Sequence, residues 1–507
     1  MAPNAPVVVS SPGKVLIAGG YLVLDPAYSG VVVSTSSRFY TVIQESSNNS
    51  KIRVRSPQFE NAQWSYSVGF EPSIAVEASS ENSSKNKFVH LALQNTLALA
   101  GEARGVKEIS EILSKGLDIT IVGDNDFYSQ RAQLEALGLP RTLSSLSSIQ
   151  PFSPQGVSLA DVHKTGLGSS AALITSLVSS LLLYLGVIPP EALKDETHEG
   201  RYLAHNVSQF IHCLAQGKIG SGFDVSAAVF GSHIYTRFTP AVLEDLMGDD
   251  EKRARALLSV LSTSNKAWDH RVRPFALPPL TRIILADVDA GSDTPSLVGK
   301  VLKWRKEDPE KANALWNALD TLNQTLAKTL LHLTDLYSKD AALYTRTVSE
   351  LASSKHDQWS AQAADNAVAA SFSEAHQISE KIREKMREMG SLAGVPIEPP
   401  EQTKLLDASI SQSGVISGGV PGGTYPIQNH LSRVLIHSET LAGGYDAVWV
   451  LVFDPVDKQG QLPAERIDSL WSSYKELDVS PLSATESKAK GIHLEDLNAI
   501  RGLKELL

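Results

Sequence analysis

The sequence predicts an α+β protein of two domains, and three features indicate this class. The chain has 507 residues, more than one hydrophobic core usually accommodates. Alternating or short apolar runs at 30–43, 281–288 and 447–453 are typical of strands. Longer apolar or amphipathic segments at 166–186 and 295–338 predict helices. Strands and helices are therefore expected in both halves of the chain.

A cluster of prolines between positions 274 and 279 favours a domain boundary close by. We expect a first domain at 1–265 and a second domain at 266–455. Beyond Asp457 the sequence becomes polar, so residues 456–507 are expected to form a peripheral tail.

Composition and charge limit the classes of function. The chain is 42% hydrophobic and 20% charged, as globular proteins are, and its net charge of −10 argues against a nucleic-acid partner. A single cysteine, Cys213, excludes a disulfide within the chain and favours a reducing compartment. Residues 1–10 lack the basic and apolar regions of a signal peptide, so we expect a cytoplasmic protein.

The apolar segment 171–188 is the one candidate for a membrane helix. Four hydroxyl residues interrupt it, and it is shorter than the ~20 residues that span a bilayer. They are Thr175, Ser176, Ser179 and Ser180. We therefore expect a buried core helix and no membrane partner.

The strongest local signal is a glycine-rich segment that opens into the helix predicted at 166–186. Two glycines let the backbone approach a ligand, and the free N–H groups and dipole of a helix N-terminus attract anions. The hydroxyl of Ser170 could bind a metal or a phosphate oxygen. No Gly-Lys-Ser/Thr closes the segment, so it is not a P-loop, and a tight turn capped by serine is the alternative. The segment reads Lys164, Thr165, Gly166, Leu167, Gly168, Ser169, Ser170, Ala171 and Ala172.

Lys14 is a candidate phosphate-binding cation. It follows Pro12-Gly13, a dipeptide that predicts a turn after a strand at 7–10. A lysine at such a turn can present a point charge to phosphate. Taken alone, the motif favours an ordinary surface lysine after a turn.

Asp224 ends a second glycine-rich segment, 217–223. An aspartate that follows an exposed backbone loop could hold Mg²⁺, orient an acceptor or pair with a lysine. The alternative is an aspartate that caps the N-terminus of a helix.

Two further sets of residues are weaker candidates. Thr294 and Pro295 predict a helix start after the strand at 281–288, so Ser292 and Thr294 could bind a substrate phosphate, with plain capping as the alternative. Three histidines recur every seven residues on the helix predicted at 191–216, but no cysteine or glutamate pattern completes a zinc site. We expect core or surface histidines at His198, His205 and His212.

Together, and in this order, these segments resemble the GHMP kinase superfamily, and most closely its phosphomevalonate kinases of the eukaryotic, fungal type. The resemblance covers most of the chain. It is carried by 11–21, 164–172, 204–228 and the glycine-rich segment before 447, with 123–130 and 399–403 specific to the subgroup.

The resemblance implies a ribosomal protein S5 domain 2-like first domain, a ferredoxin-like second domain and a site between them. It also implies transfer of phosphate from ATP to mevalonate 5-phosphate, within isoprenoid and sterol (ergosterol) biosynthesis. By position, 164–172 would hold ATP, Ser170 would place Mg²⁺, and Lys14 and Asp224 would flank the reacting phosphates, with Asp224 a further metal candidate. Weaker transfers to substrate binding are Lys14, Tyr21, Lys218, Ser221, Ser292 and Thr294.

The acceptor chemistry predicts a ranking of the two catalytic candidates. A phosphomonoester has its second pKa near ~6 and is already anionic at neutral pH, so it needs little help from a general base. It needs positive charge, because two polyanions must meet. We expect Lys14 to contribute more to catalysis than Asp224, which would position Lys14 or Mg²⁺.

The third glycine-rich motif departs from the family pattern Pro-Gly-Ala-Gly-Gly-Tyr-Asp. Here Pro421-Gly422 and 442–446 are separated by the 19 residues 423–441. The insert is either a retained intron of 19 codons or a surface loop, which costs little to close. Sequencing the cDNA decides between them, since a mature message that keeps these codons rejects the intron.

Other members of the superfamily, such as mevalonate kinase or diphosphomevalonate decarboxylase, are the nearest alternatives, and 123–130 and 399–403 count against them. A ligand sensor that binds ATP without transferring phosphate is a different class, and the presence of both Lys14 and Asp224 argues against it. The sequence carries no signal for an oligomeric state.

Overall fold

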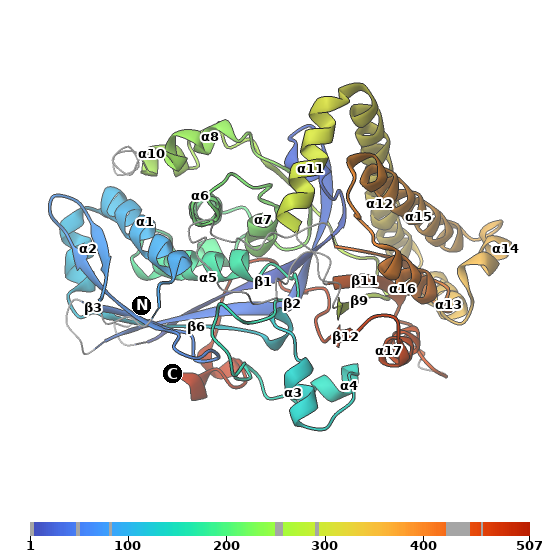
Figure 1. Cartoon of the computed structure of the whole chain (residues 1–507), viewed down its shortest axis with the longest axis horizontal. Coiled ribbons are helices and arrows are strands. Elements are labelled where there is room, and N and C mark those ends of the chain that lie inside the picture. Colours follow the sequence, from blue (N-terminus) through green and yellow to red (C-terminus); the bar gives the residue numbers. More distant parts are fainter. Residues whose placement is uncertain are drawn as a thin grey trace.

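The computed structural model describes residues 5–46, 51–80, 84–248, 257–288, 294–421, 447–457 and 460–507. Figure 1 shows two sheets, each with its own helices, lying side by side. The predicted α+β class is confirmed, because both sheets and many helices are present.

The first sheet has nine strands, in the order β13-β1-β2-β6-β3-β4-β5, with β7 beside β2 and β8 beside β7. Only β3 and β6 pair in parallel; the other pairs are antiparallel. The strands are β1 (Val7–Ala18), β2 (Ser29–Glu45), β3 (Lys51–Arg55), β4 (Gln63–Gly69), β5 (Ala75–Ala78), β6 (Leu117–Gly123), β7 (His233–Thr236), β8 (Arg271–Pro274) and β13 (His493–Leu494).

Helices α1, α5, α6 and α7 cover one face of this sheet (Figure 1). The helices of this part are α1 (Lys87–Arg104), α2 (Val106–Leu113), α3 (Arg131–Ala136), α4 (Leu143–Leu146), α5 (Ser169–Tyr184), α6 (Glu199–Gln216), α7 (Phe223–Phe230), α8 (Ala241–Glu244) and α10 (Leu257–Leu261). Helix α5 is buried along almost its whole length against β1 and β2, which explains its apolar sequence. Across the described ranges, no helix has the length and apolar character needed to cross a bilayer.

The single helix predicted over 191–216 is wrong at its start. A short 3-10 turn, Pro190–Leu193, is followed by a break, and α6 begins only at Glu199. The carboxylate of Asp195 accepts hydrogen bonds from the amide and hydroxyl of Thr197, both at 2.8 Å. Such a local side-chain turn competes with the helix, because it satisfies backbone groups in another way.

The second sheet is antiparallel, in the order β10-β11-β9-β12. Its strands are β9 (Thr281–Val288), β10 (Val415–Gly419), β11 (Ala447–Phe453) and β12 (Val479–Leu482). Its helices are α11 (Thr294–Glu307), α12 (Pro309–Lys339), α13 (Ala341–Ala352), α14 (Ser360–Ala363), α15 (Ala367–Ala393), α16 (Pro400–Ile410) and α17 (Pro463–Ser473). The long helices α12 and α15 pack together, and α15 and α16 contact the sheet at β10.

Residues 456–507, expected to form a peripheral tail, instead contribute to both sheets. Strand β12 pairs with β9 in the second sheet, and β13 pairs with β1 in the first. The backbone amide of Ser483 also donates to the buried carboxylate of Asp126 at 2.7 Å. A polar sequence was misleading here, because edge strands use backbone hydrogen bonds and tolerate polar side chains.

Candidate functional site

The predicted turn at Pro12-Gly13 is a bulge within β1, and it carries the site. Strand β1 runs on to Ala18, with a shift of register between Pro12 and Lys14. A Cβ at Gly13 would lie 2.7 Å from the Thr35 hydroxyl and 2.9 Å from the Leu167 carbonyl oxygen. Glycine therefore lets the loop before α5 come close, and the Lys14 amide donates to the same Leu167 oxygen at 2.9 Å.

The predicted glycine loop leads directly into the N-terminus of α5. Gly166 and Gly168 have φ of 77° and 80°, a region that favours glycine. Gly168 is the N-cap residue, and no side chain caps the helix, which begins at Ser169. Ser169 and Ser170 are half-buried and so remain accessible. The first amides of α5 are therefore available to an anion.

The rest of the segment 164–172 fixes the loop in place. Lys164 is exposed and forms a backbone bridge with Tyr128, and the hydroxyl of buried Thr165 donates to the Asp126 carbonyl. Ala171 and Ala172 are buried in the core, where the Ala172 carbonyl accepts from the hydroxyl of Ser11 at 2.6 Å; Leu167 is buried as well. The glycine loop is thus supported by the segment 123–130 on one side and by β1 on the other.

The Lys14 side chain extends to the tip of α5. Its ammonium donates to the Gly166 carbonyl at 2.9 Å and lies 5.5 Å from the centre of the Phe223 ring. A Cβ at Gly168 would lie 3.1 Å from the Lys14 Cε. Lys14 is 1% exposed, and burial lowers its pKa from 10.5 to about 8, opposed in part by the Asp224 carboxylate. The amine is therefore mostly charged at pH 7.

Asp224 lies in the first turn of α7, on the other side of Lys14. The N-cap is Gly222, with φ of 84°, so the alternative of an N-cap aspartate is wrong. A Cβ at Gly222 would lie 2.8 Å from both the Gln209 and Tyr235 side-chain oxygens, which leaves room only for glycine. The Asp224 Oδ1 accepts from the Val225 amide at 2.9 Å. Among the described residues, Asp224 and Lys14 are not joined by a direct ion pair.

His212, which the sequence indicated only as a core or surface histidine, lies between the two predicted motifs. Its Nε2 is 3.1 Å from the Ser170 Oγ and 3.8 Å from the Asp224 Oδ2. The seven-residue spacing of His198, His205 and His212 is the pattern that includes it, but this spacing does not distinguish the three histidines. His198 caps α6, and His205 is buried among aromatic rings.

The weaker substrate candidates lie on two neighbouring loops. Tyr21 is buried before a 3-10 turn, Leu22–Leu24. Lys218 is exposed and Ser221 is buried on the loop between α6 and α7. Arg237 ties the loops together: it donates to the Leu24 carbonyl, and to the Ile219 carbonyl at 3.0 Å. Sequence reasoning missed Arg237, because carbonyl contacts of this kind leave no local motif.

The remaining candidates fall at the limits of what the structure describes. Helix α11 begins at Thr294, one residue before the predicted start at Pro295. Ser292 and the insert at 423–441 lie outside the described residues, so their predictions stay untested.

A buried polar cluster joins the glycine loop to the second sheet. Asp287, the penultimate residue of β9, is fully buried and forms an ion pair with Arg131 of α3. Its Oδ1 also lies 3.3 Å from the Nε2 of His163, the residue before Lys164. Asp287 in turn precedes the segment 289–295. No sequence pattern indicates this cluster, because its members come from three distant segments.

A narrow cavity of about 50 Å³ lies where the end of β1 meets the second sheet. Residues 16–20 line it from the first sheet, and Gly418, Gly419 and Trp449 line it from the second. The indole N–H of Trp449 is buried and has no hydrogen-bond partner in the described part of the chain. The cavity begins at Leu16, two residues beyond Lys14 along β1.

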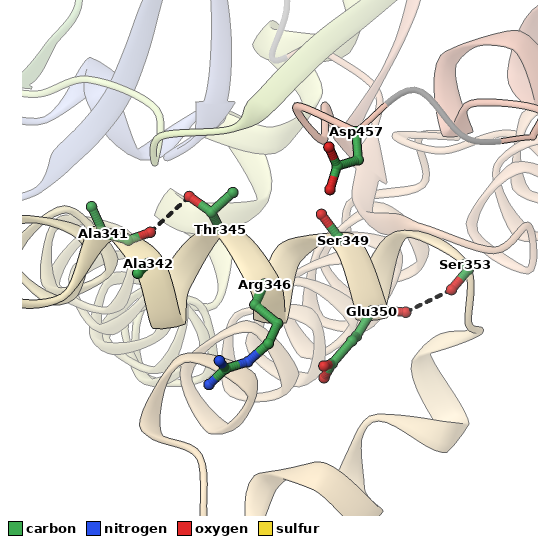
Figure 2. Close-up of a pocket in the computed structure, with 8 residues that line it drawn as sticks. All are labelled: Ala341, Ala342, Thr345, Arg346, Ser349, Glu350, Ser353 and Asp457. Carbon is green, nitrogen blue, oxygen red and sulfur yellow. Dashed lines mark hydrogen bonds between the residues drawn. The ribbon is translucent and has the colours of Figure 1, made fainter.

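A larger hollow of about 730 Å³ lies elsewhere, on the surface of α13 and beside Asp457 (Figure 2). Two of its hydroxyls already bind the helix itself: Thr345 donates to the Ala341 carbonyl at 2.7 Å, and Ser353 donates to the Glu350 carbonyl at 2.9 Å. It contains none of the candidate residues, and we assign no site to it.

The residues at the glycine loop fit a nucleotide and a hard cation. The uncapped start of α5 and the Lys14 ammonium suit phosphates. Ser170 and Asp224 carry oxygen atoms suited to a hard cation, on two different helices. Within the described residues there is no group of three His, Cys, Asp or Glu side chains that could hold a metal by itself. That is the pattern for Mg²⁺, which is usually held by one or two protein oxygens together with substrate phosphates.

Comparison with known proteins gives close relatives along nearly the whole chain. A peroxisomal phosphomevalonate kinase of Arabidopsis thaliana is 36% identical, with 93% of each chain covered. The phosphomevalonate kinases of Aspergillus fumigatus (34% identical; 94% of this chain and 93% of that one) and Gibberella zeae (33%; 98% of each) are similarly related. The chain matches no protein-family model.

Two solved structures share the fold. A Lin0012 protein from Listeria innocua aligns with a TM-score of 0.61 at 15% identity, over 97% of this chain and 100% of that one. A Streptococcus pneumoniae phosphomevalonate kinase, in complex with phosphomevalonate and AMPPNP, aligns with a TM-score of 0.55 at 15% identity, over 94% of this chain and 99% of that one.

Proposed function

Because the chain belongs to the phosphomevalonate kinase family, we propose that it transfers the γ-phosphoryl group of ATP to the phosphate of mevalonate 5-phosphate. The products are ADP and mevalonate 5-diphosphate, an intermediate of isoprenoid and sterol synthesis. The observation that supports this proposal best is the convergence of the Lys14 ammonium, the uncapped N-terminus of α5 and the Asp224 carboxylate.

The nucleotide phosphates are assigned to residues 164–172, where the first amides of α5 and the helix dipole attract negative charge. Lys14 lies at the tip of this helix, held by the Gly166 carbonyl. Its charge is placed to stabilise the phosphoryl group as it passes between two anions. The acceptor phosphate is already ionised at neutral pH, so no side chain has to remove a proton from it.

Ser170 and Asp224 are the residues we assign to Mg²⁺. When bound, Mg²⁺ neutralises charge on the nucleotide phosphates. Asp224 also attracts the Lys14 ammonium and so keeps it charged at neutral pH despite its burial. Acceptor binding is assigned to Lys14 together with Tyr21, Lys218, Ser221, Ser292 and Thr294.

The experiment that tests the function measures ADP release with three acceptors: mevalonate, its 5-phosphate and its 5-diphosphate. We expect release with mevalonate 5-phosphate alone. Release with mevalonate would indicate a mevalonate kinase. Nucleotide binding without ADP release for any of the three would indicate a ligand sensor.

The same assay also tests the insert at 423–441, by comparing the full chain with a variant that lacks these residues. The insert interrupts the glycine-rich motif that the family uses next to its site, so a variant without these residues is expected to release ADP at least as fast as the full chain. Slower release would show that the insert is a working part of the protein, and sequencing the cDNA shows whether the mature message contains it.

We further propose that the two sheets correspond to two domains, with residues 1–265 and 266–455 as their main parts, and that the protein acts in the cytoplasm. The name of the Arabidopsis relative makes the peroxisome the alternative location. A fluorescent fusion imaged with a peroxisomal marker separates the two, and overlap with the marker would contradict the cytoplasmic assignment.

A further inference from the structure

The His212 side chain lies close to both Ser170 and Asp224. It lies on α6, near the helix end, and is 3% exposed. Its Nε2 is 3.1 Å from the Ser170 Oγ, and the Gln216 side-chain nitrogen lies 3.0 Å from the same ring atom. The Asp224 Oδ2 is 3.8 Å away, in contact but beyond hydrogen-bond distance.

These contacts hold the Ser170 hydroxyl beside the ring of His212. An amide nitrogen can only donate, so the Nε2 that faces the Gln216 amide acts as an acceptor. An unprotonated imidazole nitrogen has a single lone pair, so the Ser170 hydroxyl and the Gln216 amide share it. The ring therefore keeps the Ser170 oxygen 3.1 Å from Nε2, in the first turn of α5.

The same ring contacts the Asp224 carboxylate but leaves one of its oxygens free to bind another group. One oxygen accepts from the Val225 amide at 2.9 Å, and the other packs against the imidazole at 3.8 Å. At that distance the second oxygen keeps its lone pairs for another partner. A serine hydroxyl and a carboxylate from two different helices thus lie against the same ring nitrogen.

We infer that His212 is a positioning residue that holds the Ser170 hydroxyl and the Asp224 carboxylate as one oxygen pair for a divalent cation. The inference rests on the proposed function, because the cation would be the one that accompanies the nucleotide. It assigns His212 no contact with substrate: the residue acts through Ser170 and Asp224.

The same helix provides a matched control. His205 lies two turns before His212 and is fully buried as well. It stacks on His270 with ring centres 4.3 Å apart, and its Nδ1 is 2.9 Å from the Asn206 side-chain oxygen. Replacing either histidine removes a buried imidazole from α6, but only His212 contacts Ser170 and Asp224.

The test measures ADP affinity by calorimetry, with and without Mg²⁺, for the full chain and for His212→Leu, His212→Asn and His205→Leu. In the unmodified chain Mg²⁺ is expected to strengthen ADP binding. His212→Leu should lose about 10- to 100-fold of that gain, the usual effect of removing a group that orients a metal ligand. Its affinity for metal-free ADP should differ from that of the unmodified chain by no more than about twofold. This is much less than the loss of about 10- to 100-fold expected in the presence of Mg²⁺.

His212→Asn should recover part of the gain, because its amide oxygen can accept from Ser170. His205→Leu should keep the full strengthening of ADP binding by Mg²⁺. An unchanged Mg²⁺ effect in His212→Leu would overturn the inference. Equal losses in the two leucine variants would also overturn it, since packing of α6 alone would then explain them.

Should His212→Leu fail to fold, a double-mutant cycle of Ser170→Ala with His212→Asn replaces it. The two changes should be strongly non-additive, because His212 acts through Ser170. Additive effects would count against the inference. A failure of the proposed function looks different: the unmodified chain would release no ADP with mevalonate 5-phosphate, whatever the effect of Mg²⁺ on ADP binding.

Discussion

The proposed nucleotide side and the proposed acceptor side of the site are built in different ways. The nucleotide side is mostly backbone: two glycines with positive φ and the first amides of α5, all within residues 164–172. The acceptor side is mostly side chains from separate segments, which include Tyr21, Lys218 and Ser221. A backbone site requires particular φ values and therefore particular residues in a row, whereas a side-chain site depends on tertiary placement.

In the proposed site Lys14 belongs to both sides, and its removal should have the largest effect. Lys14→Met is expected to lower kcat by about a thousandfold, the usual upper range for removing one electrostatic partner of a transition state. Asp224→Asn should cost less, because its role is to position Lys14 and the cation. Steady-state kcat values for the two variants check the ranking, and a much larger loss in Asp224→Asn would reverse it.

Thermal unfolding provides the control for Lys14→Met. The pKa of Lys14 is lower in the folded protein than in the unfolded chain, so the charged amine destabilises the fold below about pH 8. The methionine variant should therefore be at least as stable as the unmodified chain at pH 7. This advantage should shrink as the pH rises from about 8 toward 10.5. Loss of kcat accompanied by unfolding at pH 7 would mean that the comparison measures folding.

The acceptor side depends on how the second sheet is held against the glycine loop, and Asp287 tests that dependence. Asp287→Asn removes the buried partner of Arg131 and is expected to lower the free energy of unfolding by about 3 kcal/mol. Asp478 is the matched control: it lies 3.4 Å from the Arg131 Nε but is 44% exposed. Asp478→Asn should cost less than about 1 kcal/mol.

Chemical denaturation of both variants measures this difference. If both variants lose the same small amount of unfolding free energy, the cluster of Arg131, His163 and Asp287 does not hold the two sheets together. If Asp287→Asn is the less stable variant, its KM for the acceptor should also rise more than its KM for ATP, because the segment 289–295 follows directly after β9.

The sequence predicted the parts of the site that local backbone rules determine. The glycine loop, the start of α5 and the strands β9 and β11 follow from residue order alone, and the structure has them where they were expected. The sequence identified Lys14 as a candidate, but the turn predicted before it is wrong, because the structure has a bulge within β1 there. The bulge depends on Thr35 and Leu167, which approach Gly13 only in the folded chain.

What the sequence could not provide was proximity between distant segments. His212 looks the same as His205 in the sequence, and only the fold distinguishes a residue beside Ser170 from one stacked on His270. The cluster around Asp287 was hidden for the same reason. The family resemblance supplied roles for individual positions but not the residues that hold them.

Gly168 tests the backbone side of the comparison directly. Gly168→Ala places a methyl group at φ +80° and 3.1 Å from the Lys14 Cε. We expect a cost of about 1–2 kcal/mol, seen as roughly tenfold weaker nucleotide binding. Gly138 is the matched control, since it has φ +65° and no atom within 4 Å of its added Cβ. Gly138→Ala should lower stability slightly and leave nucleotide affinity unchanged; equal losses of affinity would contradict a backbone-built site.

The smallest predicted effect is a shift in pH dependence, and it tests whether Asp224 acts through Lys14. The catalytic form of Lys14 is charged, and its pKa is about 8 in the free protein, so kcat/KM should fall as the pH rises above about 8. The Asp224 carboxylate raises the pKa of Lys14 against the effect of burial. Asp224→Asn removes that attraction, so the alkaline fall should begin at lower pH, by less than about one unit.

The pH profile of kcat/KM separates this role of Asp224 from metal binding. A pure loss of a metal ligand would lower the whole profile and leave the position of its alkaline limb unchanged. Saturating Mg²⁺ should restore the height of the profile but not its position, because the shift arises from the pKa of Lys14. A limb that stays in place or moves to higher pH would show that Asp224 does not tune Lys14, and the two sides of the site would then meet only at the cation.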